Sequence, residues 1–152
     1  MDALFELIQE DEERPEGTTL HRNRLRPLER SAEQEVILYT APGMGDRQPP
    51  ESVGGEEIGP NAEDRRTRTF FVEIRKQVPY DGEESAEEAT DELYVWTVRT
   101  LCNSGYLGGL LARFPREEAI NWDFAETRDA VYALCAVQFT IEYDTLRGDP
   151  AA

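Results

Sequence analysis

The feature of the chain that most constrains its fold is a long alternation of apolar residues with others at every second position. The apolar positions are Val131, Ala133, Cys135, Val137, Phe139, Ile141 and Tyr143. Side chains two residues apart lie on the same face of an extended strand, so all seven share one face. The pattern predicts a strand over 130–144 that lies centrally in a sheet or packs against a helix.

The clearest helix lies between 85 and 102. Ser85 and Glu88 have the spacing of a capping box, in which each side chain accepts a hydrogen bond from the other residue's backbone amide. Apolar residues follow at helical spacing, among them Ala86, Ala89, Leu93 and Trp96. Because Gly105 supplies a C-terminal stop, the sequence predicts a helix of about five turns.

The remaining elements are shorter. Apolar spacing predicts a short helix over 2–13, and strand patterns occur at 35–40, 67–77 and 118–126. A turn at 127–129 joins the last of these to the strand over 130–144 as a hairpin. This order of elements predicts an α+β fold, in which one long and one short helix cover an antiparallel or mixed sheet.

Residues 41–61 differ in composition from the rest of the chain. They contain five glycines and four prolines and show no helical or strand period. Such a segment buries too little apolar surface to offset its ordering entropy, so we expect a long flexible loop. With a disordered tail at 147–152, the chain is predicted to form a single domain over 1–146.

The core is expected to include Trp96, Trp122 and Phe124, which follow the apolar periodicity of their elements. Cys102 and Cys135 also lie among apolar residues and lack the spacing of metal ligands. We therefore expect two buried free thiols and no zinc site.

The chain is strongly acidic, with 16 basic and 32 acidic residues and a net charge of −16. Such a field repels phosphates and anionic lipids, which argues against specific binding of nucleic acid or of a membrane surface. A transmembrane helix needs about 18 or more consecutive apolar residues, and the sequence contains no such run. We expect no signal peptide, because Met1 is followed directly by an acidic amphipathic segment. Synthesis in the cytoplasm is expected.

Sequence patterns of catalysis are few. The single histidine, His21, would need an orienting carboxylate and a nucleophile to act as a general base, and the sequence indicates neither. The P-loop, GxSxG, HExxH and GxGxxG motifs are absent. The acidic start of the helix over 85–102 is explained by capping and solvation, although a divalent metal site there is an alternative. We expect no catalytic residue, no cofactor and no metal.

Two groups of arginines stand out on this acidic chain and are predicted to form a subunit interface. The first is Arg22, Arg24 and Arg26, on one side of an extended segment, and the second is Arg65, Arg66 and Arg68. The acidic helix start, with Glu87 and Asp91, is their natural complement. In a ring, each subunit would present a basic face to the acidic face of its neighbour. Alternatively, both groups pair within the monomer or lie in solvent.

The whole pattern resembles the tail terminators of tailed bacteriophages, a family of minor tail proteins that includes the terminator of phage lambda. The resemblance is carried by RNRLRPLE before VILYT, then a long loop, TFFVEIRKQV, the helix EEATDELYVWTVRTLCNS and the closing strand AVYALCAVQFTIEYDT. It covers nearly the whole chain and rests on the order of the elements and on their patterns of apolar and polar residues.

The resemblance implies a hexameric ring at the head-proximal end of the tail tube. There the ring would stop tube polymerisation and offer a surface to a neck or head-completion protein, with DNA passing through its lumen. The implied location is the tail–neck junction of the virion, after assembly in the host cytoplasm. The alternatives are another neck component (a head–tail connector or head-completion subunit), a small metal-binding enzyme and an acidic interaction module.

Overall fold

The computed structural model describes residues 2–22, 27–28, 31–40, 51–53, 63–103 and 115–146. The tail predicted at 147–152 lies outside these residues, as does most of the loop predicted at 41–61. One short piece of that loop is a strand, β3 (Glu51–Val53), which pairs antiparallel with β4 (Glu63–Val78). The prediction of a loop is therefore wrong at these three residues, because they pair with β4, which follows them in the chain.

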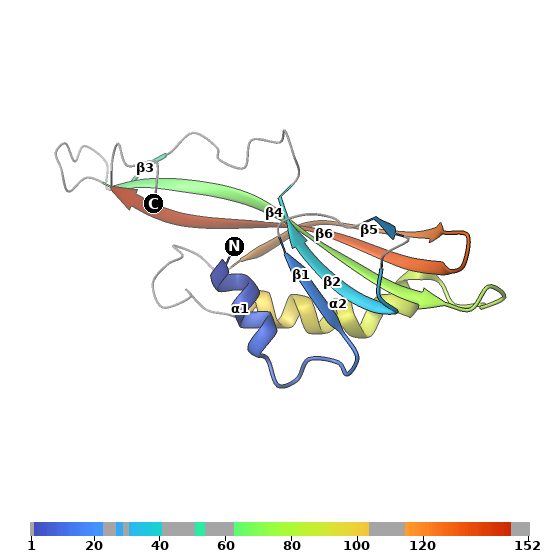
Figure 1. The fold of residues 1–152 in the computed structure, drawn as a ribbon. Helices are drawn as coiled ribbons and strands as arrows, with labels where there is room; N and C mark the ends of the chain where they lie inside the picture. The colour runs from blue at the N-terminus through green and yellow to red at the C-terminus, as the bar shows by residue number, and fades with distance from the viewer. Residues whose placement is uncertain are drawn as a thin grey trace.

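The predicted α+β fold with a mixed sheet is confirmed (Figure 1). The sheet has the order β1-β2-β4-β6-β5, with β3 paired to β4 beside this path. Besides β3 and β4, its strands are β1 (Thr19–Arg22), β2 (Gln34–Tyr39), β5 (Arg116–Glu126) and β6 (Val131–Leu146). The β1 and β2 strands are parallel, and every other pair in the sheet is antiparallel.

The strand predicted from the long alternation, β6, lies between β4 and β5 as expected of a central strand. Both β4 and β6 have 16 residues and pair along their whole length, from Glu63 opposite Leu146 to Val78 opposite Val131. At ~3.3 Å per residue this pair is about 50 Å long. The pair extends past the limits predicted from apolar alternation because backbone hydrogen bonds continue through its polar end.

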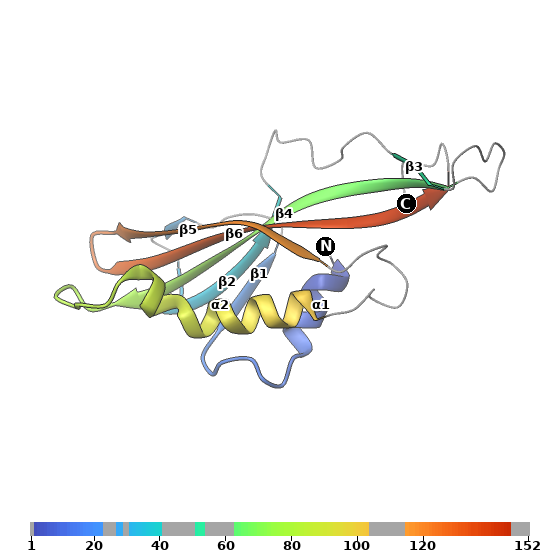
Figure 2. The same ribbon diagram turned by 180° about the vertical axis from the view of Figure 1, so that it is seen from behind.

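Both helices, α1 (Asp2–Glu10) and α2 (Ala86–Cys102), cover the same face of the sheet (Figures 1 and 2). The capping box of α2 is confirmed, since the Ser85 side chain accepts from the Glu88 amide and the Glu88 side chain accepts from the Ser85 amide. α1 ends three residues earlier than predicted. It stops where the Asp11 carboxylate accepts a hydrogen bond from the Glu13 amide at 2.9 Å, which replaces a helical backbone bond.

The core lies between the helices and this face. Phe70 and Phe139 are fully buried and stack with their ring centroids 5.3 Å apart, and Trp96 is also buried. Trp122 is half-buried and packs against the core. The prediction for Phe124 was wrong, because 47% of it is exposed. It lies near the end of the edge strand β5, opposite the small residue Ala133.

Both cysteines are free, as predicted. Cys135 is buried and Cys102 is half-buried. Burial raises the pKa of the Cys135 thiol to about 12 and also raises the pKa of Cys102. Both thiols therefore stay protonated and unreactive near neutral pH.

Part of the β4–β6 pair projects beyond the helices (Figures 1 and 2). We call residues 63–68 of β4 and 141–146 of β6 the arm. A helix of 17 residues such as α2 spans about 25 Å at ~1.5 Å per residue, which is half the length of the strand pair. The difference in length gives the molecule two unlike ends: the arm at one, and the start of α2 at the other.

Candidate functional site

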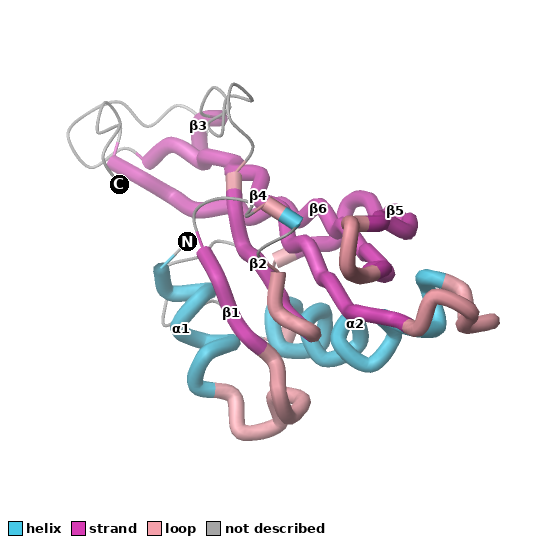
Figure 3. Tube along the Cα trace, turned by 45° about the vertical axis from the view of Figure 1, so that its right-hand side comes forward, coloured by secondary structure: helices cyan, strands magenta, loops and turns pink. Residues whose placement is uncertain are grey.

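The first predicted arginine group is described only at Arg22, because Arg24 and Arg26 lie outside the described residues. Arg22 ends β1, which runs beside α1 (Figure 3). Its side chain is exposed, and its guanidinium carbon lies 5.3 Å from the centroid of the Phe5 ring. This cation–π contact holds Arg22 on the side of the sheet that carries the helices.

The second group, Arg65, Arg66 and Arg68, lies in the arm. Strand register places Arg65 between Asp144 of β6 and Glu51 of β3, and places Arg68 opposite Ile141. Arg65 and Arg68 are half-buried. The arginines thus lie within a strand end that also carries acidic residues, and their spacing along the chain did not indicate this.

The predicted acidic partners, Glu87 and Asp91, are exposed in the first turns of α2. Asp91 also borders a shallow groove between the end of α1 and α2, together with Glu13, Glu92, Val95 and Arg99. Thirteen strand positions separate Arg65 from Val78, which precedes α2, so the second arginine group and the acidic start of α2 lie toward opposite ends of a stretch on the order of 40 Å. The structure does not bring them together within one chain, and a direct contact between them requires two copies.

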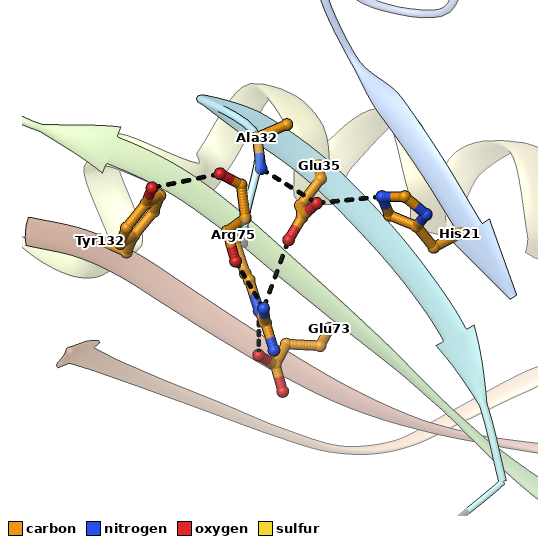
Figure 4. Close-up of polar contacts among 7 residues, drawn as sticks. His21, Ala32, Glu35, Glu73, Arg75 and Tyr132 are labelled. Carbon is orange, nitrogen blue, oxygen red and sulfur yellow. Dashed lines mark hydrogen bonds and ion pairs between the residues drawn. The ribbon is translucent and has the colours of Figure 1, made fainter. Parts of the chain in front are cut away.

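A buried polar network on the other face of the sheet was not predicted from the sequence (Figure 4). Its centre is Glu35 of β2, whose side chain is fully buried. Arg75 of β4 lies directly opposite in register, and its side chain is only 5% exposed. The Arg75 Nη1 and the Glu35 Oε1 are 3.3 Å apart, which makes this a buried ion pair.

Arg75 also contacts other residues beside Glu35. Its Nε donates to Glu73 Oε1 at 2.6 Å, and its Nη1 donates to the Ser31 Oγ at 2.6 Å. The Tyr132 hydroxyl donates to the Ser31 carbonyl at 3.4 Å, which ties β6 to the same segment. One guanidinium therefore joins β4 to β2 and to the chain before β2.

His21 takes part in this network, which corrects the view that no carboxylate is available to it. Its Nε2 lies 3.2 Å from the Glu35 Oε2, and the same oxygen accepts from the Ala32 amide at 3.3 Å. The sequence concealed this contact because His21 and Glu35 lie on different strands, and only the parallel pairing of β1 with β2 makes them neighbours.

The chemistry of the network is that of a structural clamp. The Ser31 hydroxyl accepts a hydrogen bond from a guanidinium, which stays protonated in proteins and cannot remove the hydroxyl proton. Ser31 is therefore not activated as a nucleophile by Arg75. Side chains from β1, β2 and β4 and the segment 31–32 meet at one buried ion pair, so the network links these strands.

A cleft of about 470 Å³ opens at the end of the molecule near the start of α2. We call it the end cleft. Its lining residues are Val78, Pro79, Tyr80, Gly82, Glu84, Phe124 and Val131. Tyr80 is 62% exposed and Phe124 is 47% exposed, which is unusual for large aromatic side chains that line one cleft.

The end cleft is shaped by a tight turn between β4 and α2. The Gly82 amide donates to the Pro79 carbonyl at 3.2 Å, and a Cβ at Gly82 would lie 3.3 Å from the same oxygen. Tyr80 follows the last residue of β4 by two positions, and the hairpin between β5 and β6 brings Phe124 and Val131 to the same cleft. The apolar period of the sequence had assigned Phe124 to the core.

Two other polar contacts fix the helices. The Asp11 Oδ2 accepts from the Trp96 Nε1 at 3.0 Å and from the Thr100 Oγ1 at 2.8 Å, which ties the end of α1 to α2. The Tyr94 hydroxyl contacts both Glu117 carboxylate oxygens at 3.0 Å, which ties α2 to β5. Burial, together with this carboxylate, raises the pKa of Tyr94 to about 12.

Within the described ranges, no group of three or more His, Cys, Asp or Glu residues has a geometry that could hold a metal ion. Neither described helix has the length and hydrophobicity needed to cross a membrane. The chain matches no protein-family model and none of the curated proteins with which it was compared.

Proposed function

We propose that this chain is a structural subunit of a tailed bacteriophage, a tail terminator that works as a hexameric ring. In this role it binds the last ring of the tail tube at its head-proximal end and stops tube polymerisation. Its other surface then receives a neck or head-completion protein. The location is the tail–neck junction of the virion, after assembly in the host cytoplasm.

The observation that supports this proposal best is the difference between the two ends of the β4–β6 pair. One end is the arm, with Arg65 and Arg68, and the other carries the end cleft and the acidic start of α2. When two unlike ends of a molecule are complementary, contacts between its copies are head-to-tail, and they close into a ring if the rotation at each contact closes. The resemblance in element order to tail terminators supplies the ring number.

The mechanism is steric and electrostatic and needs no catalytic residue. Each subunit occupies the growing surface of the tube and presents a different surface above it. With a net charge of −16, a ring of these chains repels the phosphates of the DNA that passes through its lumen. The protein therefore guides assembly without binding nucleic acid specifically.

The first experiment is the absolute mass of the purified protein by light scattering, with negative-stain images of the same fractions. A six-fold ring is the expected result. If the protein is a monomer, purified tail tubes of the same phage are added, and rings are expected at one end of each tube. A monomer that leaves the tubes bare and free to elongate would contradict the proposal.

Two other outcomes would favour other functions. A twelve-fold ring that binds portal before tail would indicate a connector or head-completion subunit instead. Heat release and stabilisation on titration with magnesium, calcium or manganese would indicate a metal-binding protein.

A further inference from the structure

The end cleft joins exposed aromatic rings to negative charge. Among the described residues that line it, Glu84 alone is charged, and the rest offer apolar surface or backbone. Exposed acidic residues flank the lining residues along the chain, namely Asp81, Glu83, Asp123, Glu126 and Asp129. The basic residues near them in sequence are the half-buried Lys76 and the exposed Arg128. A ligand that suits this cleft is flat or aliphatic along its length and positively charged at its end.

An arginine side chain has this chemistry. Its guanidinium stacks on the faces of aromatic rings, and its planar set of N–H donors matches a carboxylate. Its aliphatic stem also packs along apolar surface while the charged group lies outside. In the end cleft, Tyr80 and Phe124 offer the rings and Glu84 offers the carboxylate.

The chain itself carries arginines at its opposite end. Arg65 and Arg68 lie in the arm, and the arm and the end cleft are the two ends of the same pair of strands. Both arginines make contacts within their own chain. The arm also carries the acidic residues Glu63, Asp64, Glu142 and Asp144, so the contact is made by one guanidinium and not by a basic surface. A guanidinium has five N–H donors, so a contact within the chain leaves donors for a second partner.

From this arrangement we infer that the end cleft receives the arm of a second copy of the chain, with the neighbour's Arg65 between Tyr80 and Phe124 and beside Glu84. This inference rests on the proposed ring and names the contact that closes it. Each copy gives an arm and receives one, so every cleft in a closed ring is filled. The exposed rings of the single chain are then covered by the neighbour.

A photo-cross-linking experiment on the full chain tests this contact directly. Phe124→p-benzoylphenylalanine places the probe in the cleft, and Val95→p-benzoylphenylalanine is the matched control at an exposed position of α2 outside it. After illumination, the Phe124 probe is expected to yield dimers in which the cross-link maps to the peptide containing Arg65. The Val95 probe is expected to yield no such adduct.

A charge exchange provides a second test. Glu84→Arg and Arg65→Glu are each expected to weaken self-association, and the double variant is expected to restore it. Phe124→Ser removes an aromatic anchor and is expected to weaken self-association on the order of 30-fold. The urea midpoint of each variant, compared with that of the unaltered chain, separates a lost contact from a lost fold.

The outcomes separate this inference from the proposed ring. Rings whose Phe124 probe reaches the arm support both. Rings with a cross-link elsewhere, or with none, overturn the cleft contact and leave the ring standing. A protein that stays monomeric at low concentration, without or with tubes, but forms arm-linked dimers when concentrated supports the contact and contradicts the ring. A monomer with no dimer under any condition overturns both.

Discussion

Replacing Arg75 by methionine is expected to destabilise the fold severely. Methionine keeps most of the length of the side chain but removes the guanidinium from Glu35, which is fully buried. Among the described residues, the Glu35 carboxylate then keeps its contacts with His21 and the Ala32 amide. Breaking a buried ion pair by removing one partner costs about 3–5 kcal/mol, because the remaining charge stays out of water.

The chain contains a matched control for this substitution. Arg116 donates from Nε to Glu118 Oε1 at 2.6 Å, which repeats the atoms, distance and two-residue spacing of the Arg75–Glu73 bond. The Arg116 side chain is 62% exposed, however, whereas that of Arg75 is 5% exposed. Because exposed ion pairs contribute about 0–1 kcal/mol, Arg116→Met is expected to change stability by less than about 1 kcal/mol.

Urea unfolding followed by tryptophan fluorescence measures both variants, at two protein concentrations so that self-association is separated from folding. An unchanged dependence on urea with a lower midpoint indicates lost stability of the same native state. The double variant Glu35→Met with Arg75→Met removes both charges and is expected to lose less than Arg75→Met alone. Equal losses of unfolding free energy for Arg75→Met and Arg116→Met would refute the idea that burial determines how much this network contributes to stability.

Three further predictions concern single contacts. Hydrogen bonds from the Glu13 amide and the Thr100 hydroxyl, and one from Trp96, lower the pKa of Asp11 below its ordinary value of 3.8. The ionised Asp11 therefore stabilises the fold above about pH 4, and this stabilisation is lost as the pH falls through the lowered pKa. Asp11→Asn is therefore expected to lower the urea midpoint at neutral pH and to reduce its further fall in acid. Gly17 has a φ of 77°, and a Cβ at this position would meet no atom within 4 Å. Gly17→Ala is therefore expected to lower the free energy of unfolding in urea by about 1–2 kcal/mol through backbone strain alone, and Gly17→Asn is expected to lower it less. Tyr94→Phe is expected to remove the last step, near pH 12, from an ultraviolet titration of the tyrosines.

Periodicity and capping predicted the main elements of the fold because they depend on residues close together in sequence. The alternation from Val131 to Tyr143 identified the central strand β6, and the pair Ser85 and Glu88 identified the start of α2. The α+β class followed from the order of these elements. None of these features depends on which strands pair.

Features that depend on pairing between distant strands were not predicted. The partnership of Glu35 with Arg75 arises from the β2–β4 register, and the approach of His21 arises from the parallel β1–β2 pair. In the sequence, Glu35 stands before an apolar run and suggested only the start of a strand. In the structure it is completely buried.

The candidate interface was predicted by residue type and not by position. The arginines of the second group were identified, but their acidic neighbours Glu51 and Asp144 became apparent only from the strand register. The end cleft was missed because apolar periodicity assigns Phe124 to the core. Whether a neighbouring residue covers such a ring depends on the lengths of the helix and the strands around it, which the local pattern does not specify.

The central place of β6 has a consequence for how the protein is made. Ribosomes release the chain in order, so β5 emerges before β6, which is its partner in the sheet, and β4 also waits for β6 to complete its pairing. Contacts between distant parts of a chain also form slowly, because loop closure must come before they stabilise anything. A nascent chain therefore keeps Phe70, Val72 and Ile74 without their β6 neighbours until synthesis passes β6. Copies whose β6 has not yet been synthesised lack one strand of the arm and Val131 of the end cleft, so they cannot yet self-associate through these two surfaces.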